Sequence, residues 1–178
     1  MKNTISLLLI LSAVAIFGLR ISNGITFKQN VSGLLKRAAD ANTIELANEE
    51  LTKVIDYLEA NNMTSGYTSV LWETPDEDID FWYRNLKASQ KELQNLNSES
   101  ALEKTNVLIK LRETLVDGGE KTKVTVPDGL AVYPNNLLWG ILMIYALAAI
   151  SIGFMVPAIE HDKKTKAALA EAAAKKPK

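Results

Sequence analysis

Two stretches near the ends of the chain carry no charged side chain: NTISLLLILSAVAIFGL at residues 3–19 and LLWGILMIYALAAISIGFMVPAI at residues 137–159. As a helix, the first measures roughly 26 Å, slightly less than a hydrocarbon core of about 30 Å. The second is long enough to span with some tilt, and Trp139 near its start suits a membrane interface. The sequence therefore predicts two transmembrane helices.

The first stretch has two interpretations. Lys2 precedes it and Ala13-Val14-Ala15 resembles a cleavage site, which is the pattern of a cleavable signal peptide. Cleavage after Ala15 would leave apolar residues 16–19 at the new N-terminus, which is unfavourable in water. We therefore predict an uncleaved signal anchor over residues 1–22.

The charges that flank the two stretches predict an orientation. The tail at residues 160–178 holds six Lys against three acidic residues, and the positive-inside rule places such a tail in the cytoplasm. Two spans then place the N-terminus there too. Residues 23–136, which have an excess of acidic side chains, would be periplasmic or extracellular. We expect a cell membrane, with the bacterial inner membrane as the first choice.

Composition excludes several kinds of chemistry. The 178 residues include no cysteine, so disulfides, thiolate nucleophiles and cysteine-ligated metals are impossible. The single histidine, His161, sits among charges after the second stretch, where we expect it to be solvated. A formal net charge of −1 gives no reason to expect nucleic-acid binding. No phosphate-binding loop or hydrolase motif occurs. We expect no cofactor, no metal and no enzymatic activity.

The region between the spans begins with a helical pattern. We predict a long helix from Phe27 to Ala60, continuous with the first span, with a bend possible at Asn23-Gly24 and an end at Asn61-Asn62. Its apolar residues recur every three or four positions, which is helical spacing: Val31, Leu34, Ala38, Ala41, Ile44, Ala47, Leu51, Val54 and Leu58.

Two further helices are predicted. Thr74, Pro75 and Glu77 form a capping-box pattern that would begin the second helix, and Asn97-Ser98 would separate it from the third. The third would end at glycines 118–119. Residues 70–72 would fold back onto the helices, and residues 124–129 would form an extended piece and a turn. The predicted fold class is all-α, with three antiparallel helices between the spans. The tail at residues 160–178 is predicted to be mobile.

Four aromatic residues are the main candidates for a partner contact: Trp72, Phe81, Trp82 and Tyr83. Tryptophan and tyrosine often anchor interfaces, but they pack cores as well. Successive helix residues point about 100° apart, so three consecutive aromatics cannot all face one side. At least one of them should be exposed unless a loop or a partner covers it.

Three further features of the sequence could have a function. Asp76, Asp78 and Asp80 resemble the start of a calcium loop. The loop would need a glycine and a final acid further on, but Phe81 and Lys87 occupy those positions. We therefore interpret the three aspartates as an acidic helix N-terminus. Arg20 could contact an acid on a neighbouring membrane protein, or extend to the lipid headgroups.

Ala149 and Gly153 form a small-xxx-small pair that permits close packing of helices in a membrane.

The order of segments resembles that of bacterial sensory proteins such as chemoreceptors, although no motif of that family is present. We expect a non-enzymatic accessory or scaffolding subunit of a membrane complex that contacts the lipid bilayer and other membrane proteins or a second copy. The alternative is a ligand-sensing module that signals through a partner. An apolar stripe left open on the first long helix would favour the first hypothesis. A pocket lined by Trp72, Trp82 and Tyr83 would favour the second.

Overall fold

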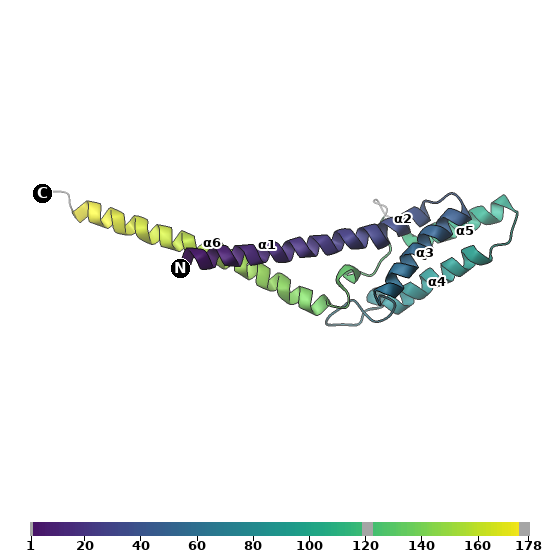
Figure 1. Ribbon diagram of the computed structural model, residues 1–178, viewed down its shortest axis with the longest axis horizontal. Coiled ribbons are helices and arrows are strands. Elements are labelled where there is room, and N and C mark those ends of the chain that lie inside the picture. Colours follow the sequence, from purple (N-terminus) through teal and green to yellow (C-terminus); the bar gives the residue numbers. More distant parts are fainter. Residues whose placement is uncertain (1, 119–122, 175–178) are drawn as a thin grey trace. The chain divides into compact units, whose positions relative to one another are not determined.

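The computed structural model describes residues 2–118 and 123–174, and most of them are helical (Figure 1). The chain divides into two compact units. One comprises residues 1–21 and 138–178, and the other comprises residues 22–137. The predicted all-α class is confirmed to the extent that the chain is mainly helical, with a pair of very short strands.

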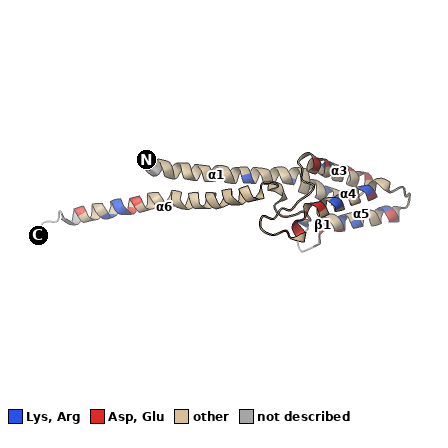
Figure 2. Cartoon of the chain, turned by 90° about the horizontal axis from the view of Figure 1, so that it is seen from below, with Lys and Arg blue, Asp and Glu red and all other residues tan. Residues whose placement is uncertain are grey.

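Two helices are long and apolar enough to cross a membrane: α1 (Lys2–Phe27) and α6 (Asn136–Ala174). Figure 2 shows almost no charged residues along α1 and the first part of α6, whereas charges are frequent on α3, α4 and α5. Both predicted spans therefore coincide with continuous apolar helices.

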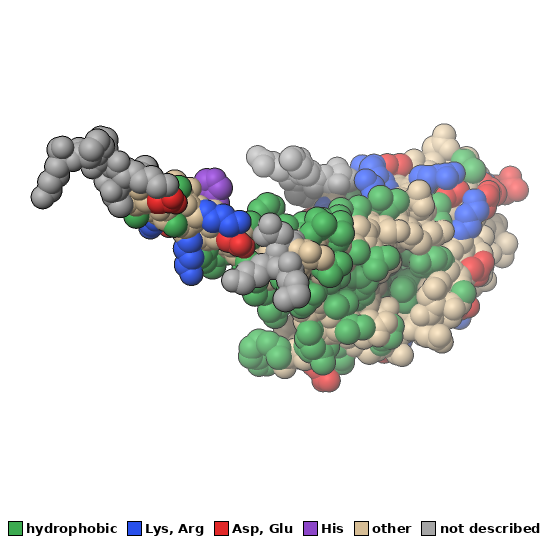
Figure 3. Space-filling view, turned by 60° about the vertical axis from the view of Figure 1, so that its left-hand side comes forward, with side chains coloured by type: hydrophobic (Ala, Val, Ile, Leu, Met, Phe, Trp, Pro, Cys, Tyr) green, Lys and Arg blue, Asp and Glu red, His purple; other side chains and the backbone are tan. Residues whose placement is uncertain are grey.

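The tail after the second span is helical as far as Ala174. Lys164 and Lys166 each pair with an acid one turn earlier, Glu160 and Asp162, at Nζ–O distances of 3.5 and 2.7 Å. Such i,i+4 pairs support a helix that has no face to bury. In Figure 3 the histidine, drawn in purple, lies among the charged side chains of this segment.

The helix that begins with the first span has no break at residues 23–24. It passes through a short π-helical segment, Lys28–Ser32, into α2 (Gly33–Ala39). The prediction that it continues to Ala60 is wrong, because a turn follows and α3 begins separately at Ile44–Ala60. The long helix is thus continuous with the first span only through Ala39.

Polar side chains hold the turn between α2 and α3. Asp40 accepts hydrogen bonds from Lys36 and from Arg112, the latter at 2.9 Å. Thr43 caps α3, since its hydroxyl accepts a bond of 3.2 Å from the Leu46 N–H. The predicted apolar stripe keeps its spacing across this turn, so periodicity alone could not reveal it.

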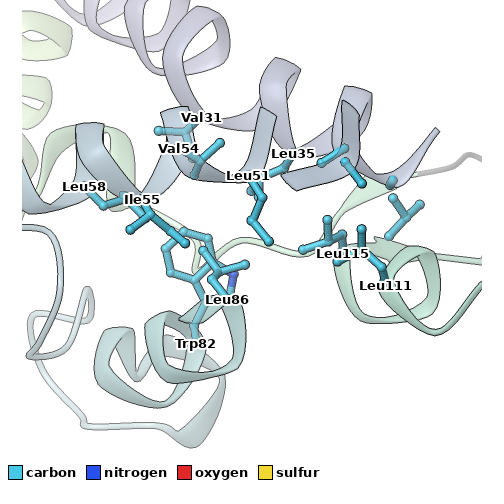
Figure 4. Packing of buried hydrophobic residues seen from close by; sticks show 14 of the residues in the cluster. Val31, Leu35, Leu51, Val54, Ile55, Leu58, Trp82, Leu86, Leu111 and Leu115 are labelled. Carbon is cyan, nitrogen blue, oxygen red and sulfur yellow. The ribbon is translucent and has the colours of Figure 1, made fainter. Parts of the chain in front are cut away.

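Among the described residues of the unit 22–137, four helices, not three, pack together. α4 is Ile79–Asn95 and α5 is Ala101–Leu115. α2 contacts α3 and α5, and α4 also contacts α3 and α5, so the four close into a ring. The apolar stripe of α2 and α3 is covered inside this ring and is not open to a partner. Figure 4 shows the core, which is built from Val31, Leu35, Leu51, Val54, Ile55, Leu58, Trp82, Leu86, Leu111 and Leu115.

The starts of α4 and α5 lie a few residues after the predicted positions. Thr74 to Glu77 does not start the α-helix, because Pro75–Glu77 forms a separate 3-10 turn. Asp78 caps α4 by accepting a bond of 3.0 Å from the Phe81 N–H. Ser100, rather than residues 97–98, caps α5.

A short antiparallel pair of strands follows α5: β1 (Val116–Asp117) and β2 (Lys123–Val124). The helix therefore runs into a strand instead of ending at a glycine cap, and Gly119 lies outside the described residues. The predicted extended piece and turn are confirmed. At the turn Gly129 adopts a φ of 83°, a left-handed conformation that favours glycine. A 3-10 turn, Leu130–Val132, leads towards α6.

Candidate functional site

The four candidate aromatic residues have different environments. Trp82 is buried, with 8% of its surface exposed, and Tyr83 is half-buried against the core. Phe81 is 57% exposed and Trp72 is 74% exposed. The three consecutive aromatics at the start of α4 thus divide as the helical geometry requires, and Phe81 faces outwards.

Trp82 joins α4 to the strand segment. Its indole Nε1–H donates a hydrogen bond of 2.8 Å to the carbonyl of Thr125. Its ring packs among the core residues near Ile55 and Leu86 (Figure 4). Because the ring is fixed by a hydrogen bond and by packing, it also fixes the direction in which the neighbouring Phe81 projects.

Tyr83 faces α3. Its hydroxyl donates a short hydrogen bond to Glu59, and Lys87 also contacts this carboxylate. Burial of the phenol, followed by the bond to Glu59 and its charge, raises the pKa of Tyr83 to about 12. The bond from Tyr83, followed by that from Lys87, lowers the pKa of Glu59.

A cleft of about 800 Å³ lies between the start of α4, the end of α5 and β2. Phe81, Trp82 and Leu86 contribute to its lining, and Thr125 and Pro127 lie on the strand side. Trp72 and Tyr83 do not line it. The structure therefore brings two of the four candidate aromatics into one cleft and leaves the other two outside.

The lining of this cleft is acidic. Among the described lining residues the one lysine is Lys123, which lies 3.8 Å from the Asp128 carboxylate. The acidic lining residues are Asp76, Glu77, Asp78, Asp117 and Asp128. Such an arrangement of an exposed aromatic ring with surrounding carboxylates can accept a cationic group beside an apolar one.

Two of the three aspartates that resemble a calcium loop have other partners. Asp78 caps α4, and Asp80 pairs with Arg84 at 3.0 Å. Within residues 2–118 and 123–174, no group of three histidine, cysteine or acidic side chains is placed to hold a metal ion.

The loop before α4 protrudes, which corrects the prediction that residues 70–72 fold back onto the helices. Tyr67 and Asp78 form an antiparallel bridge, and the Thr68 N–H bonds to the Glu77 carbonyl at 3.1 Å. These contacts close residues 69–76 into a loop, here called the tongue. Val70 and Leu71 at its tip are exposed, Leu71 by 75%.

The remaining candidates belong to the other unit. Arg20 is half-buried on α1 and has no ion-pair partner in the part of the chain that the structure describes. Ala149 is buried against α1 in a cluster with Ala13 and Ala146. A Cβ on Gly153 would lie 2.7 Å from Cγ1 of Ile10, so the two helices approach closely there.

Sequence reasoning missed the strand side of the cleft. Asp117, Lys123, Thr125 and Asp128 lie 30 or more residues after Phe81, and no motif connects them to α4. Thr125 contributes a backbone carbonyl, which side-chain identity does not encode.

The comparisons with known proteins returned nothing that could assign this geometry to a family. No family model matches the chain, and no curated protein and no solved structure matches it either.

Proposed function

We propose that this chain is a non-enzymatic integral membrane protein, an accessory or scaffolding subunit of a membrane complex. Its helical unit, residues 22–137, would hold a partner while α1 and α6 anchor it in the bilayer. The observation that carries the proposal is the placement of Phe81, an aromatic side chain that is more than half exposed on the wall of a cleft beside the fixed Trp82. Exposed aromatic anchors in preformed pockets are typical hot spots of protein interfaces.

The chemistry of the cleft indicates the kind of partner. Carboxylates from both of its sides, such as Asp76 and Asp117, favour a segment with lysine or arginine. Phe81 favours an apolar or cationic side chain against its ring. The apolar stripe on α2 and α3 is buried, so it supports neither scaffolding nor self-association through that surface, and the proposal rests on the cleft.

Binding to the cleft is tested by comparing full-length variants in mild detergent. Phe81→Ala should leave the melting temperature almost unchanged, because exposed substitutions usually cost less than about 0.5 kcal/mol. It should strongly reduce the recovery of the partner that co-purifies with the parent protein. Leu102→Ala is the control, since Leu102 is 72% exposed on α5 and lies outside the cleft. Equal recovery with both variants would contradict the proposal.

Ligand sensing is the second candidate. A volume of about 800 Å³ falls within the usual range for small-molecule sites, roughly 300–1,000 Å³. In that case Phe81→Ala would abolish binding of a small cationic compound while partner recovery stayed intact. The two functions therefore give opposite results with the same variant.

The proposed orientation has both termini in the cytoplasm and residues 23–136 outside, most readily in a bacterial inner membrane with α1 as an uncleaved anchor. The basic tail supports this orientation. Because the chain has no native cysteine, single cysteines at positions 65 and 170 report each side cleanly. An impermeant thiol reagent on intact cells should label position 65 alone. Labelling of position 170 alone would reverse the orientation.

A further inference from the structure

The tongue, residues 69–76, carries apolar side chains that its own helical unit does not cover. Val70, Leu71 and Trp72 at its tip are 48, 75 and 74% exposed. The bridge between Tyr67 and Asp78 fixes the base of the tongue, so these side chains protrude from a closed loop and not from a free strand. Consecutive exposed residues of this kind need a partner surface of matching chemistry.

The base of the tongue is attached to the start of α6. Gly129 lies between the two, since a Cβ there would be 3.8 Å from the Thr68 Cβ and 2.8 Å from the Asn136 Nδ2. The Asn136 amide donates a bond of 3.0 Å to the Gly129 carbonyl. Asn136 is the first residue of α6, and the exposed, apolar Leu137 follows it.

A second contact holds the same arrangement. The Tyr133 hydroxyl donates a bond of 2.8 Å to the Ser65 carbonyl, just before the tongue. Leu71 follows Thr68 by three residues, which is at most about 11 Å of extended chain. The tip of the tongue therefore remains close to the residue where the apolar segment of α6 begins.

We propose that the tip of the tongue, Val70-Leu71-Trp72, inserts into the interfacial layer of the bilayer that α6 enters. Tryptophan is enriched in that layer because its indole has an apolar face and a polar N–H. The headgroup region is several ångströms deep on each side of the hydrocarbon core, a depth that the tip can reach. This inference rests on the proposed function, in which α6 spans the membrane.

The charges near the tongue predict a lipid preference. The tip carries no lysine or arginine, and the acidic residues Glu73, Asp76 and Glu77 follow it. Insertion is therefore driven by apolar side chains, and anionic headgroups would repel this loop. A zwitterionic surface such as phosphatidylcholine is the lipid chemistry that fits.

The test uses full-length protein in phosphatidylcholine nanodiscs, with one spin-labelled cysteine at a time at position 71, 102 or 147. Collisions with oxygen report lipid, and collisions with a water-soluble nickel chelate report water. Leu102 is exposed on α5 to nearly the same extent as Leu71, and Leu147 is exposed within the apolar part of α6. We expect the oxygen-to-nickel ratio at position 71 to exceed that at position 102 several-fold and to fall when anionic lipid is added.

Each other outcome overturns the inference in a distinguishable way. Water-like collisions at position 71 with lipid-like collisions at position 147 would refute the tongue while leaving the span intact. Water-like collisions at position 147 would refute the span as well. Protection of position 71 from both reagents would show that protein covers it.

Trp72→Asp, which alters an exposed side chain, should shift a label at position 71 towards water without changing the melting temperature.

Discussion

The hydroxyl of Tyr83 on α4 donates a hydrogen bond to the carboxylate of Glu59 on α3. This bond crosses between two helices that also share the apolar core at Leu58 and Leu86. The bond needs a neutral phenol as donor and an ionised carboxylate as acceptor. It is therefore weakened at high pH, where the phenol ionises, and at low pH, where the carboxylate is protonated.

We expect the Tyr83–Glu59 contribution to stability to be lost at both ends of the pH scale. Burial, followed by the bond to Glu59 and its charge, raises the pKa of Tyr83 to about 12, above its unfolded value of about 10. The stability that the neutral phenol contributes is therefore complete below pH 10 and is lost as pH rises through about 12. The pKa of Glu59 is lowered, so its contribution is present above its unfolded pKa and is lost as pH falls through the folded one.

Tyrosinate absorbance measures the alkaline limb, as the difference between the parent protein and Tyr83→Phe. The difference should develop near pH 12. In Glu59→Gln it should develop at lower pH, because the charge and the charged acceptor are gone, but still above pH 10 because burial remains. An unchanged curve in Glu59→Gln would show that the bond has no effect on the phenol.

The cap of α4 gives a prediction about stability. Asp78→Ala should destabilise the helical unit by about 1 kcal/mol, because it removes the acceptor for the Phe81 N–H. Thr74→Ala should cost less, since the Thr74 hydroxyl contacts Glu77 and caps no α-helical N–H. Urea unfolding of the two variants compares them directly. A larger loss of unfolding free energy from Thr74→Ala than from Asp78→Ala would show that the helix starts where the capping-box pattern predicts it.

Gly153 gives a prediction about the apolar helices. A Cβ at this position would lie 2.7 Å from Ile10 Cγ1 and 3.2 Å from the Ser6 carbonyl oxygen, so Gly153→Ile should force α1 and α6 apart locally. The readout is cross-linking between cysteines that replace Ser12 and Tyr145, whose hydroxyls lie 3.1 Å apart. Cross-linking should fall in Gly153→Ile and persist in Gly140→Ile, because Gly140 has open space around its Cβ position. Equal cross-linking in both variants would argue against close packing at Gly153.

Trp82, the buried neighbour of the exposed Phe81, gives a prediction about the stability of the core. Trp82→Ala should destabilise the helical unit by about 3–5 kcal/mol, because it removes a buried ring and leaves the Thr125 carbonyl without its donor. Thermal melting measures the loss. A Trp82→Ala variant that melts like the parent protein would show that this residue does not hold the strand segment.

Local signals in the sequence predicted most of the helices, but not how they pack. The two apolar helices and the apolar face of α4 follow from periodicity and the absence of charge. The turn at residues 40–43 was missed because the stripe stays in phase across it. Asp40 holds the turn through its contact with Arg112, and Thr43 starts α3 by capping the Leu46 N–H. The ring of four helices depends on that turn, so it could not be predicted either.

The candidate site was predicted in part. Three consecutive aromatics cannot share one face of a helix, so one of them had to be exposed, and Phe81 is that residue. The strand side of the cleft depends on tertiary folding between α4 and residues 117–128, and in particular on a backbone carbonyl. Spacing along the chain carries no information about such a contact.

We propose that Phe81 and its cleft contact a partner in the membrane complex. A photoreactive phenylalanine analogue at position 81 in native membranes tests this contact, with position 102, which is also exposed but lies outside the cleft, as the control. We expect a discrete cross-linked protein adduct from position 81 that is absent from position 102 and is weakened by Asp117→Asn on the strand side of the cleft. No adduct from position 81, or the same adducts from both positions, would contradict it.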